Sequence, residues 1–302
     1  LLDQAGVLCN PQIPPILPES ATCGSKQASV GWSCHKSSTR KASRMRTNLV
    51  TTGSVLQRAT SVLLALLFAA LVAACSLTPA TGPLADGTYW ASTCPEDESA
   101  VSGFGAIDVS GSDYVHPFGG QAEVVVRDLA ARVAVCGGGH LRVVAFWDNR
   151  ATPITLFDGV LSLPGATANA RYRKLDSTTS DVVAKVAEAY NKLGINGFES
   201  GTDAVGQLQL AQEFGKALGT KSYLVTALVT DGMQTVAPVT IKVKDRASAL
   251  RAADALPVPK LAGELLVVGL GKTKKWSPGM SKTADNLKAM WSRICERSGA
   301  SS

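Results

Sequence analysis

Acidic and hydroxyl side chains in three short segments of the sequence have the types and the spacing of a metal site. Asp108, Ser110 and Ser112 alternate in the first segment, Thr202 lies in the second and Asp231 in the third. Oxygen ligands with few negative charges suit a hard divalent cation in octahedral geometry. We therefore expect the two carboxylates to supply the charge for Mg²⁺ or Mn²⁺, and the three hydroxyls to complete the protein's share of the ligands. Water would fill the remaining positions, and a carboxylate from outside could displace one water.

Hydrophobic patterning predicts the elements that would position these segments. Apolar runs predict strands at residues 104–109, 141–147, 154–161, 223–230 and 265–270. Apolar residues at helical spacing predict helices around residues 122–133, 181–193, 204–218 and 287–294. Strands that alternate with helices indicate a mainly parallel sheet covered by helices on both faces. Ligands of such sheets bind beyond the carboxyl ends of the strands, where residues 108–112 and 230–232 lie.

The three segments together resemble the metal-ion-dependent adhesion site of von Willebrand factor type A (vWA) domains. Residues 106–112, 201–203 and 228–232 match that site in order, spacing and context. The resemblance implies a Rossmann-like α/β fold whose mainly parallel sheet has one antiparallel edge strand. The resemblance also implies that the five residues named above, Asp108, Ser110, Ser112, Thr202 and Asp231, are the metal ligands. It further implies that the metal binds an acidic group of a partner protein. The sequence departs from the family's pattern at residues 150–180 and 233–262, so the partner-facing surface stays open.

The front of the chain has the features of an export signal. Residues 62–74 form a run of 13 apolar residues, and Arg46 and Arg58 precede it. This run is too short for an ordinary membrane span but typical of the hydrophobic region of a signal peptide. Residues 72–75, Val-Ala-Ala-Cys, resemble a bacterial lipobox, which implies that Cys75 becomes a lipidated N-terminus. An ordinary secretory signal or a short membrane anchor with a chance cysteine is the alternative.

These patterns divide the chain into four parts. Residues 1–44 are predicted to be unstructured or a mis-started upstream segment, and residues 45–75 a signal peptide with a lipobox that ends at Cys75. Residues 76–100 are expected to be a flexible tether, because they are rich in Pro, Gly, Thr and Ala without periodicity. Residues 101–299 are expected to form the vWA-like domain.

The charge distribution argues against a nucleic-acid partner. The chain has 30 Lys and Arg and 24 Asp and Glu residues, a formal net charge of +6. Residues 1–75 hold seven of these basic residues but only two of the acidic ones, so the rest of the chain is close to neutral. A nucleic-acid-binding surface needs clustered positive charge in the folded part.

Three cysteines follow Cys75 in the sequence: Cys94, Cys136 and Cys295. Export permits a disulfide, and three cysteines allow one bridge and one free thiol. In the expected layout, the first and the last helix both run away from the metal site and end near Cys136 and Cys295. We therefore expect the pair Cys136–Cys295, with pairs that involve Cys94 left open.

The sequence thus predicts an exported lipoprotein on the outer side of the cell membrane. Its vWA-like domain would bind an acidic group of a protein ligand through Mg²⁺ or Mn²⁺, without catalysis. One alternative is a metal-dependent hydrolase that uses the same Asp and Ser loops, but no His or Glu is placed by motif as its general base. The other alternative is a scaffold domain that never binds metal.

Overall fold

The four central strands of the sheet run parallel, as the apolar runs of the sequence predict. The structure, a computed structural model, describes residues 6–8, 83–97, 100–111, 117–148, 153–193, 201–219, 222–236, 244–272 and 280–300. All of them belong to one compact unit. The strands are β1 (Gly6–Leu8), β2 (Ala100–Asp108), β3 (Gly139–Phe146), β4 (Ile154–Leu161), β5 (Ser222–Val229) and β6 (Gly263–Val268). Their order in the sheet is β1-β6-β5-β2-β3-β4, and β4 lies antiparallel to β3 at one edge.

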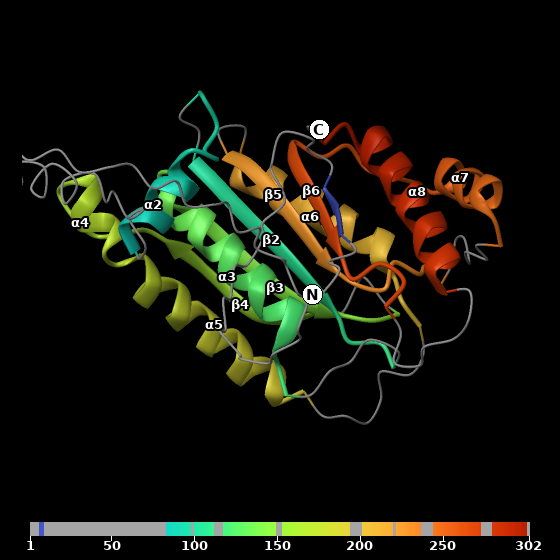
Figure 1. Cartoon of the computed structure of the whole chain (residues 1–302), viewed down its shortest axis with the longest axis horizontal. Helices are drawn as coiled ribbons and strands as arrows, with labels where there is room; N and C mark the ends of the chain where they lie inside the picture. The colour runs from blue at the N-terminus through green and yellow to red at the C-terminus, as the bar shows by residue number, and fades with distance from the viewer. Residues whose placement is uncertain are drawn as a thin grey trace, which may run out of the picture. The chain divides into compact units, whose positions relative to one another are not determined.

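Helices cover both faces of this sheet (Figure 1). They are α2 (Pro83–Ala91), α3 (Gly120–Val135), α4 (Ala168–Tyr172), α5 (Leu175–Asn191), α6 (Ala204–Leu218), α7 (Arg246–Ala255) and α8 (Met280–Ser298). One apolar core lies between the sheet and α3 and α5, and a second lies between the sheet and α6 and α8. Strand β2 is buried over nearly its whole length and β5 over residues 224–228, because both of their faces are covered, which explains their largely apolar sequence. The predicted fold class, a Rossmann-like α/β fold with an antiparallel edge strand, is therefore confirmed.

Residues 83–97 belong to this folded unit rather than to a flexible tether. Helix α2 packs against α3 and α4, and Trp90 contacts the core on the α3 side of the sheet. The prediction failed here because the helix is short and its buried contacts come from other elements, so the local sequence shows no clear period. Helices α4 and α7 also lie outside the predicted helices, within residues 150–180 and 233–262, where the sequence departs from the vWA pattern.

Strand β1 is a second correction to the sequence analysis, which assigned no strand to residues 1–44. Gly6, Val7 and Leu8 pair antiparallel with Val268, Val267 and Leu266 at the edge of β6. Three residues carry too little pattern to be distinguished from a loop by sequence. The rest of residues 1–44, the signal segment 45–75 and Cys75 lie outside the described residues.

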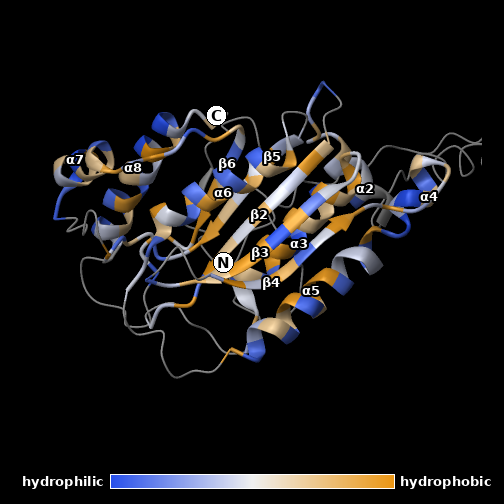
Figure 2. Ribbon diagram, turned by 180° about the vertical axis from the view of Figure 1, so that it is seen from behind, coloured by the Kyte–Doolittle hydropathy of each residue, from blue (hydrophilic) through white to orange (hydrophobic). Residues whose placement is uncertain are grey.

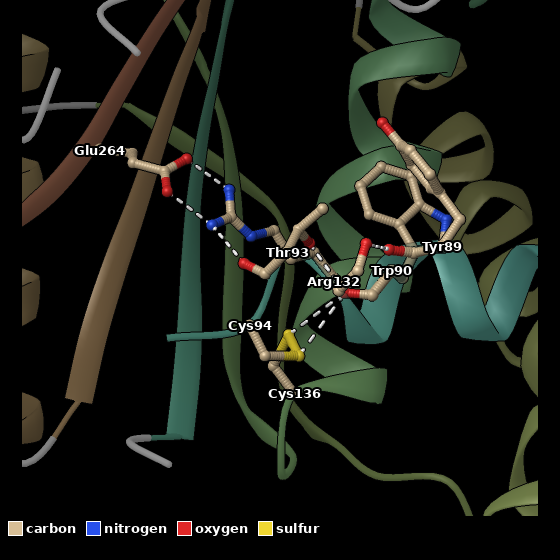
Figure 3. The surroundings of a disulfide bond; sticks show 8 residues. Tyr89, Trp90, Thr93, Cys94, Arg132, Cys136 and Glu264 are labelled. Carbon is tan, nitrogen blue, oxygen red and sulfur yellow. Dashed lines mark hydrogen bonds and ion pairs between the residues drawn. A yellow bond between two sulfur atoms is a disulfide. The ribbon is translucent and has the colours of Figure 1, made fainter. Parts of the chain in front are cut away.

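A disulfide joins the segment after α2 to the end of α3 (Figure 3). It links Cys94 and Cys136, whose Cα atoms are 5.3 Å apart. Beside it, Arg132 forms an ion pair with Glu264 of β6 and donates a hydrogen bond to the Thr93 carbonyl oxygen at 3.0 Å. The expected pair Cys136–Cys295 is therefore wrong. The expected free thiol among these three cysteines is wrong as well, because Cys295 is also disulfide-bonded.

Within the described part of the chain, no helix has both the length and the apolar character needed to span a membrane. The apolar run at residues 62–74 lies outside the described residues.

Candidate metal site

The three predicted segments meet at the carboxyl edge of the central strands. Asp108 is the last residue of β2, and β2 pairs with β5 in a parallel register that sets Ile107 beside Val229. This register brings Asp108 next to Thr230, the first residue after β5. Thr202 stands in the turn before α6, and that turn is tied to the end of β3 because the Asp203 N–H donates to the Trp147 carbonyl oxygen at 2.7 Å.

Hydrogen bonds between side chains connect the segments directly. The Thr202 hydroxyl donates to the Ser110 hydroxyl oxygen at 3.0 Å, across 92 residues of sequence. The Thr230 hydroxyl donates to Oδ2 of Asp108 at 2.8 Å, and the Ser110 N–H donates to Oδ1 of the same carboxylate at 2.9 Å. Asp108, Ser110, Thr202 and Asp231 are all at most 4% exposed. Four of the five predicted ligands therefore lie together, and the fifth, Ser112, lies outside the described residues.

The loop after β5 is held in place by the turn before α6. The Thr202 N–H donates to the Thr235 hydroxyl at 2.7 Å, and the Thr235 N–H donates back to the Thr202 carbonyl oxygen at 3.1 Å. The buried Gln234 amide donates to Asp203 at 3.0 Å and accepts from the Val205 N–H at 3.1 Å. Asp203 itself caps α6 by accepting from the Gly206 N–H, as its position before the helix predicts. These bonds give the site a rigid frame.

Helix α8 supports the same loop from the other side. Gly232 has a φ of 84°, and a Cβ at this position would lie 2.3 Å from Leu270 and 2.9 Å from the indole nitrogen of Trp291. The Trp291 N–H donates to the Gly232 carbonyl oxygen at 3.0 Å. Glycine after Asp231 is thus required both by the backbone conformation and by the close approach of α8.

Burial raises the pKa of the Asp108 carboxyl group to about 6. Hydrogen bonds from Ser110 and Thr230 oppose this shift, and the negative charge of Asp231 adds to it. No described Lys, Arg or His forms an ion pair with Asp108. Two neighbouring buried carboxylates favour a cation between them, because a cation offsets both their desolvation and their mutual repulsion.

The donor set fits a divalent cation that prefers oxygen ligands. It consists of two carboxylates and hydroxyls, with neither nitrogen nor sulfur, which suits Mg²⁺ or Mn²⁺ better than zinc. The described residues contain no group of three or more His, Cys, Asp or Glu side chains that could hold a metal. A site with two carboxylates lies below that number, so its other ligands would have to be hydroxyls and water.

Sequence reasoning missed the residues that frame the site. The sequence predicts Thr230 at the end of a strand but not among the metal ligands, and Gln234 and Thr235 lie in residues 233–262, where the sequence departs from the vWA pattern. Thr230 does have a sequence signal, because it directly follows an apolar strand. A hydroxyl at this position lies at the carboxyl edge of the sheet, beside the end of the neighbouring strand. No local signal distinguishes Gln234 or Thr235, because their partners lie about 30 residues away.

The fold and the site together describe a Rossmann-like α/β domain with oxygen side chains gathered at the carboxyl edge of its sheet. A scan against protein-family models and a search of curated proteins both found no match to this chain.

Proposed function

We propose that this chain is an exported lipoprotein whose vWA-type domain binds a carboxylate of a partner protein through Mg²⁺ or Mn²⁺. The observation that carries this proposal is the bond between the Thr202 and Ser110 hydroxyls beside the buried Asp108 and Asp231. Three loops that are distant in sequence converge on one small group of oxygen atoms. Turn capping alone explains each residue singly, but it does not require the three loops to meet.

Each residue of the site has a separate task in this proposal. Asp108 and Asp231 balance the charge of the cation, and Ser110, Ser112 and Thr202 add neutral oxygen ligands or hold water ligands in place. Bound metal supplies an open coordination position that accepts a carboxylate. The frame formed by Gln234, Thr235 and Trp291 keeps the protein oxygens in position, which reduces the entropy cost of binding the ion.

The proposal of an exported, membrane-anchored protein rests on the sequence pattern at residues 45–75. Basic residues, a short apolar run and a cysteine after small residues follow in the order of a lipoprotein signal. The disulfide Cys94–Cys136 supports it, because disulfides persist mainly in oxidising compartments outside the cytosol.

Calorimetry with Mg²⁺ and Mn²⁺ tests the metal site. Asp108→Asn keeps the shape of the side chain but removes its charge, so it should abolish binding. Ser110→Ala and Thr202→Ala each remove one neutral oxygen and should weaken binding about 10–100-fold. Asp181→Asn, at an exposed position of α5, is the matched control and should bind as the wild type does.

Circular dichroism of each variant checks that the fold is retained. Wild-type Mg²⁺ affinity in folded Asp108→Asn would mean that these residues only cap turns, and the metal-free scaffold would become the better proposal. Partner capture from cell-surface extracts, with Mg²⁺ and with a chelator, then tests the second step, since binding through the metal requires that the chelator release the partner.

A further inference from the structure

Helix α4 and the turn after it present three basic side chains that have no partner in the described part of the chain. Arg171, Arg173 and Lys174 are all exposed. None of their side chains forms an ion pair or a hydrogen bond with a described residue. Exposed acidic residues also lie at this end of the domain, in α2, in the segment after it and at the start of α5: Asp86, Glu96, Asp97 and Asp176. None of them forms an ion pair with the three basic residues, which stand within four consecutive positions and so form a local cluster of positive charge.

Close packing holds α4 against α2. Gly87 is buried in α2, and a Cβ at this position would lie 2.3 Å from Cγ of Tyr172 in α4. At its other end α4 is capped by Thr167, whose hydroxyl accepts from the Ala170 N–H at 3.2 Å. The three basic residues are therefore carried on an element that is fixed to α2.

Helix α2 is the first described element after the proposed lipid anchor. Only seven residues, 76–82, separate Cys75 from Pro83. The eight Cα–Cα steps from Cys75 to Pro83 span at most about 29 Å when the chain is fully extended. If Cys75 carries the lipid, the start of α2 stays within that distance of the membrane surface.

The anchored end of the domain lies away from the candidate metal site. Figures 1 and 2 both show α2 and α4 at the end of the molecule where β2 begins. Strand β2 has nine residues, about 30 Å of extended chain, and Asp108 stands at its far end. If α2 and α4 lie against the membrane, the candidate metal site faces away from the membrane.

We propose that the surface of Arg171, Arg173 and Lys174 is a membrane-docking surface that binds anionic phospholipid headgroups. This inference rests on the proposed lipid anchor at Cys75. A basic residue close to an anionic membrane contributes about 1 kcal/mol of binding, so three of them orient a domain that the lipid already holds nearby. The short tether and the charge complementarity select an anionic lipid surface as the occupant.

Hydrogen exchange of the lipidated full-length protein in vesicles tests this surface. Backbone amides of residues 168–174 should exchange on the order of tenfold more slowly in vesicles of phosphatidylcholine with phosphatidylglycerol than in phosphatidylcholine alone. High salt should remove the difference, because it screens charges at a membrane surface. Equal exchange in both kinds of vesicle at low salt would overturn the proposal.

A charge-reversal pair provides the control. Arg171→Glu, Arg173→Glu and Lys174→Glu together should remove the protection. The matched variant Lys244→Glu, Arg246→Glu and Arg251→Glu changes the net charge equally at exposed positions of and before α7, which lies at the opposite end of the domain in both views. It should keep the protection, and an equal loss in both variants would overturn a specific docking surface.

Two further measurements separate the possible failures. Glycerophosphate without vesicles should give no protection, and protection by it would point to free phosphate groups rather than a membrane. The mass of the N-terminal peptide reports whether Cys75 is lipidated. Absence of the lipid refutes the proposed anchor, whereas lipidated protein without protection at α4 refutes only the docking surface and leaves the metal site untouched.

Discussion

At the scale of single residues, the Thr230 hydroxyl sets the direction of the Asp108 carboxylate. It donates to Oδ2 at 2.8 Å, while the Ser110 N–H occupies Oδ1. Both bonds leave further lone pairs on the carboxylate for a cation. Thr230 is therefore a positioning residue for the candidate metal site, although it was not among the predicted ligands.

Thr230→Val should weaken Mg²⁺ binding about tenfold, because the carboxylate loses one of the two groups that orient it. Calorimetry measures this change. Thr226→Val, in β5, the strand that ends just before Thr230, is the matched control, since the buried Thr226 hydroxyl has no hydrogen-bond partner among the described residues. The control should keep its Mg²⁺ affinity and raise the free energy of unfolding by about 1 kcal/mol. Equal Mg²⁺ affinity in the two variants would remove the role assigned to Thr230.

At the scale of elements, Asp128 of α3 lies partly buried near Tyr89 of α2. Burial raises the pKa of the Asp128 carboxyl group to about 6 from 3.8, and the charge of Arg127 opposes the shift. Partial burial raises the pKa of Tyr89 in α2, and the negative charge of Asp128 raises it further. The Asp128 carboxylate therefore lies near α2. The two helices thus hold a carboxylate that is destabilising when ionised.

The pH dependence of Asp128→Asn follows from this burial. Between about pH 4 and 6 the folded protein holds the Asp128 proton more tightly than the unfolded chain, so this residue makes stability fall as the pH rises through that window. Asp128→Asn has no carboxyl group to ionise, so it should not lose stability in this way. Its free energy of unfolding at pH 7 should exceed that of the wild type by about 1–2 kcal/mol. Urea unfolding at several pH values measures the difference. The control Asp181→Asn should show no such trend, and a difference independent of pH for Asp128→Asn would contradict the interpretation.

The disulfide between the α2 segment and α3 should be important for stability. It closes a loop over a sequence separation of 42 residues, for which the chain-entropy estimate is about 4 kcal/mol. Replacing Cys94 and Cys136 together by Ala should therefore lower the free energy of unfolding by about 2–4 kcal/mol in urea titrations. Mass mapping of the unreduced protein should find a peptide pair that contains both residues, and a peptide pair that joins Cys136 to Cys295 would contradict the structure.

At the scale of the whole molecule, export and folding make different demands on the N-terminal residues. Strand β1 completes the sheet at the edge of β6, whereas cleavage before Cys75 would remove residues 6–8. In the processed protein, β6 would then become the edge of the sheet. Amides of β6 should exchange faster in processed protein than in the full chain, because their antiparallel partner is gone.

Fatty-acid labelling of growing cells tests the processing. The wild-type protein should carry the label, and Cys75→Ser should abolish it, because the thiol is the attachment point of the lipid. Peptides from residues 1–74 should be absent from the labelled protein. A label that survives Cys75→Ser, or a peptide from residues 1–44 in surface material, would contradict the lipoprotein proposal.

Patterns that depend on neighbours along the chain are visible in the sequence. The bounds of β4 and α6 agree with the sequence patterns because each reflects local periodicity and a local stop, such as Gly219 after α6. The order of Asp108, Thr202 and Asp231 at the ends of predicted elements follows in the same way. A parallel sheet brings its carboxyl ends to one edge, so the sequence alone was sufficient to place these three residues near one another.

Only the tertiary structure decided which groups touch. It paired Cys136 with Cys94 instead of Cys295, set the Thr230 hydroxyl on Asp108 and fixed α2 beside α4. Each outcome depends on a distance of a few ångströms between segments that are far apart in sequence, and such distances are set by the packing of whole helices on the sheet. Local patterns report which faces are buried, whereas the partners of each buried group follow from how the elements pack together.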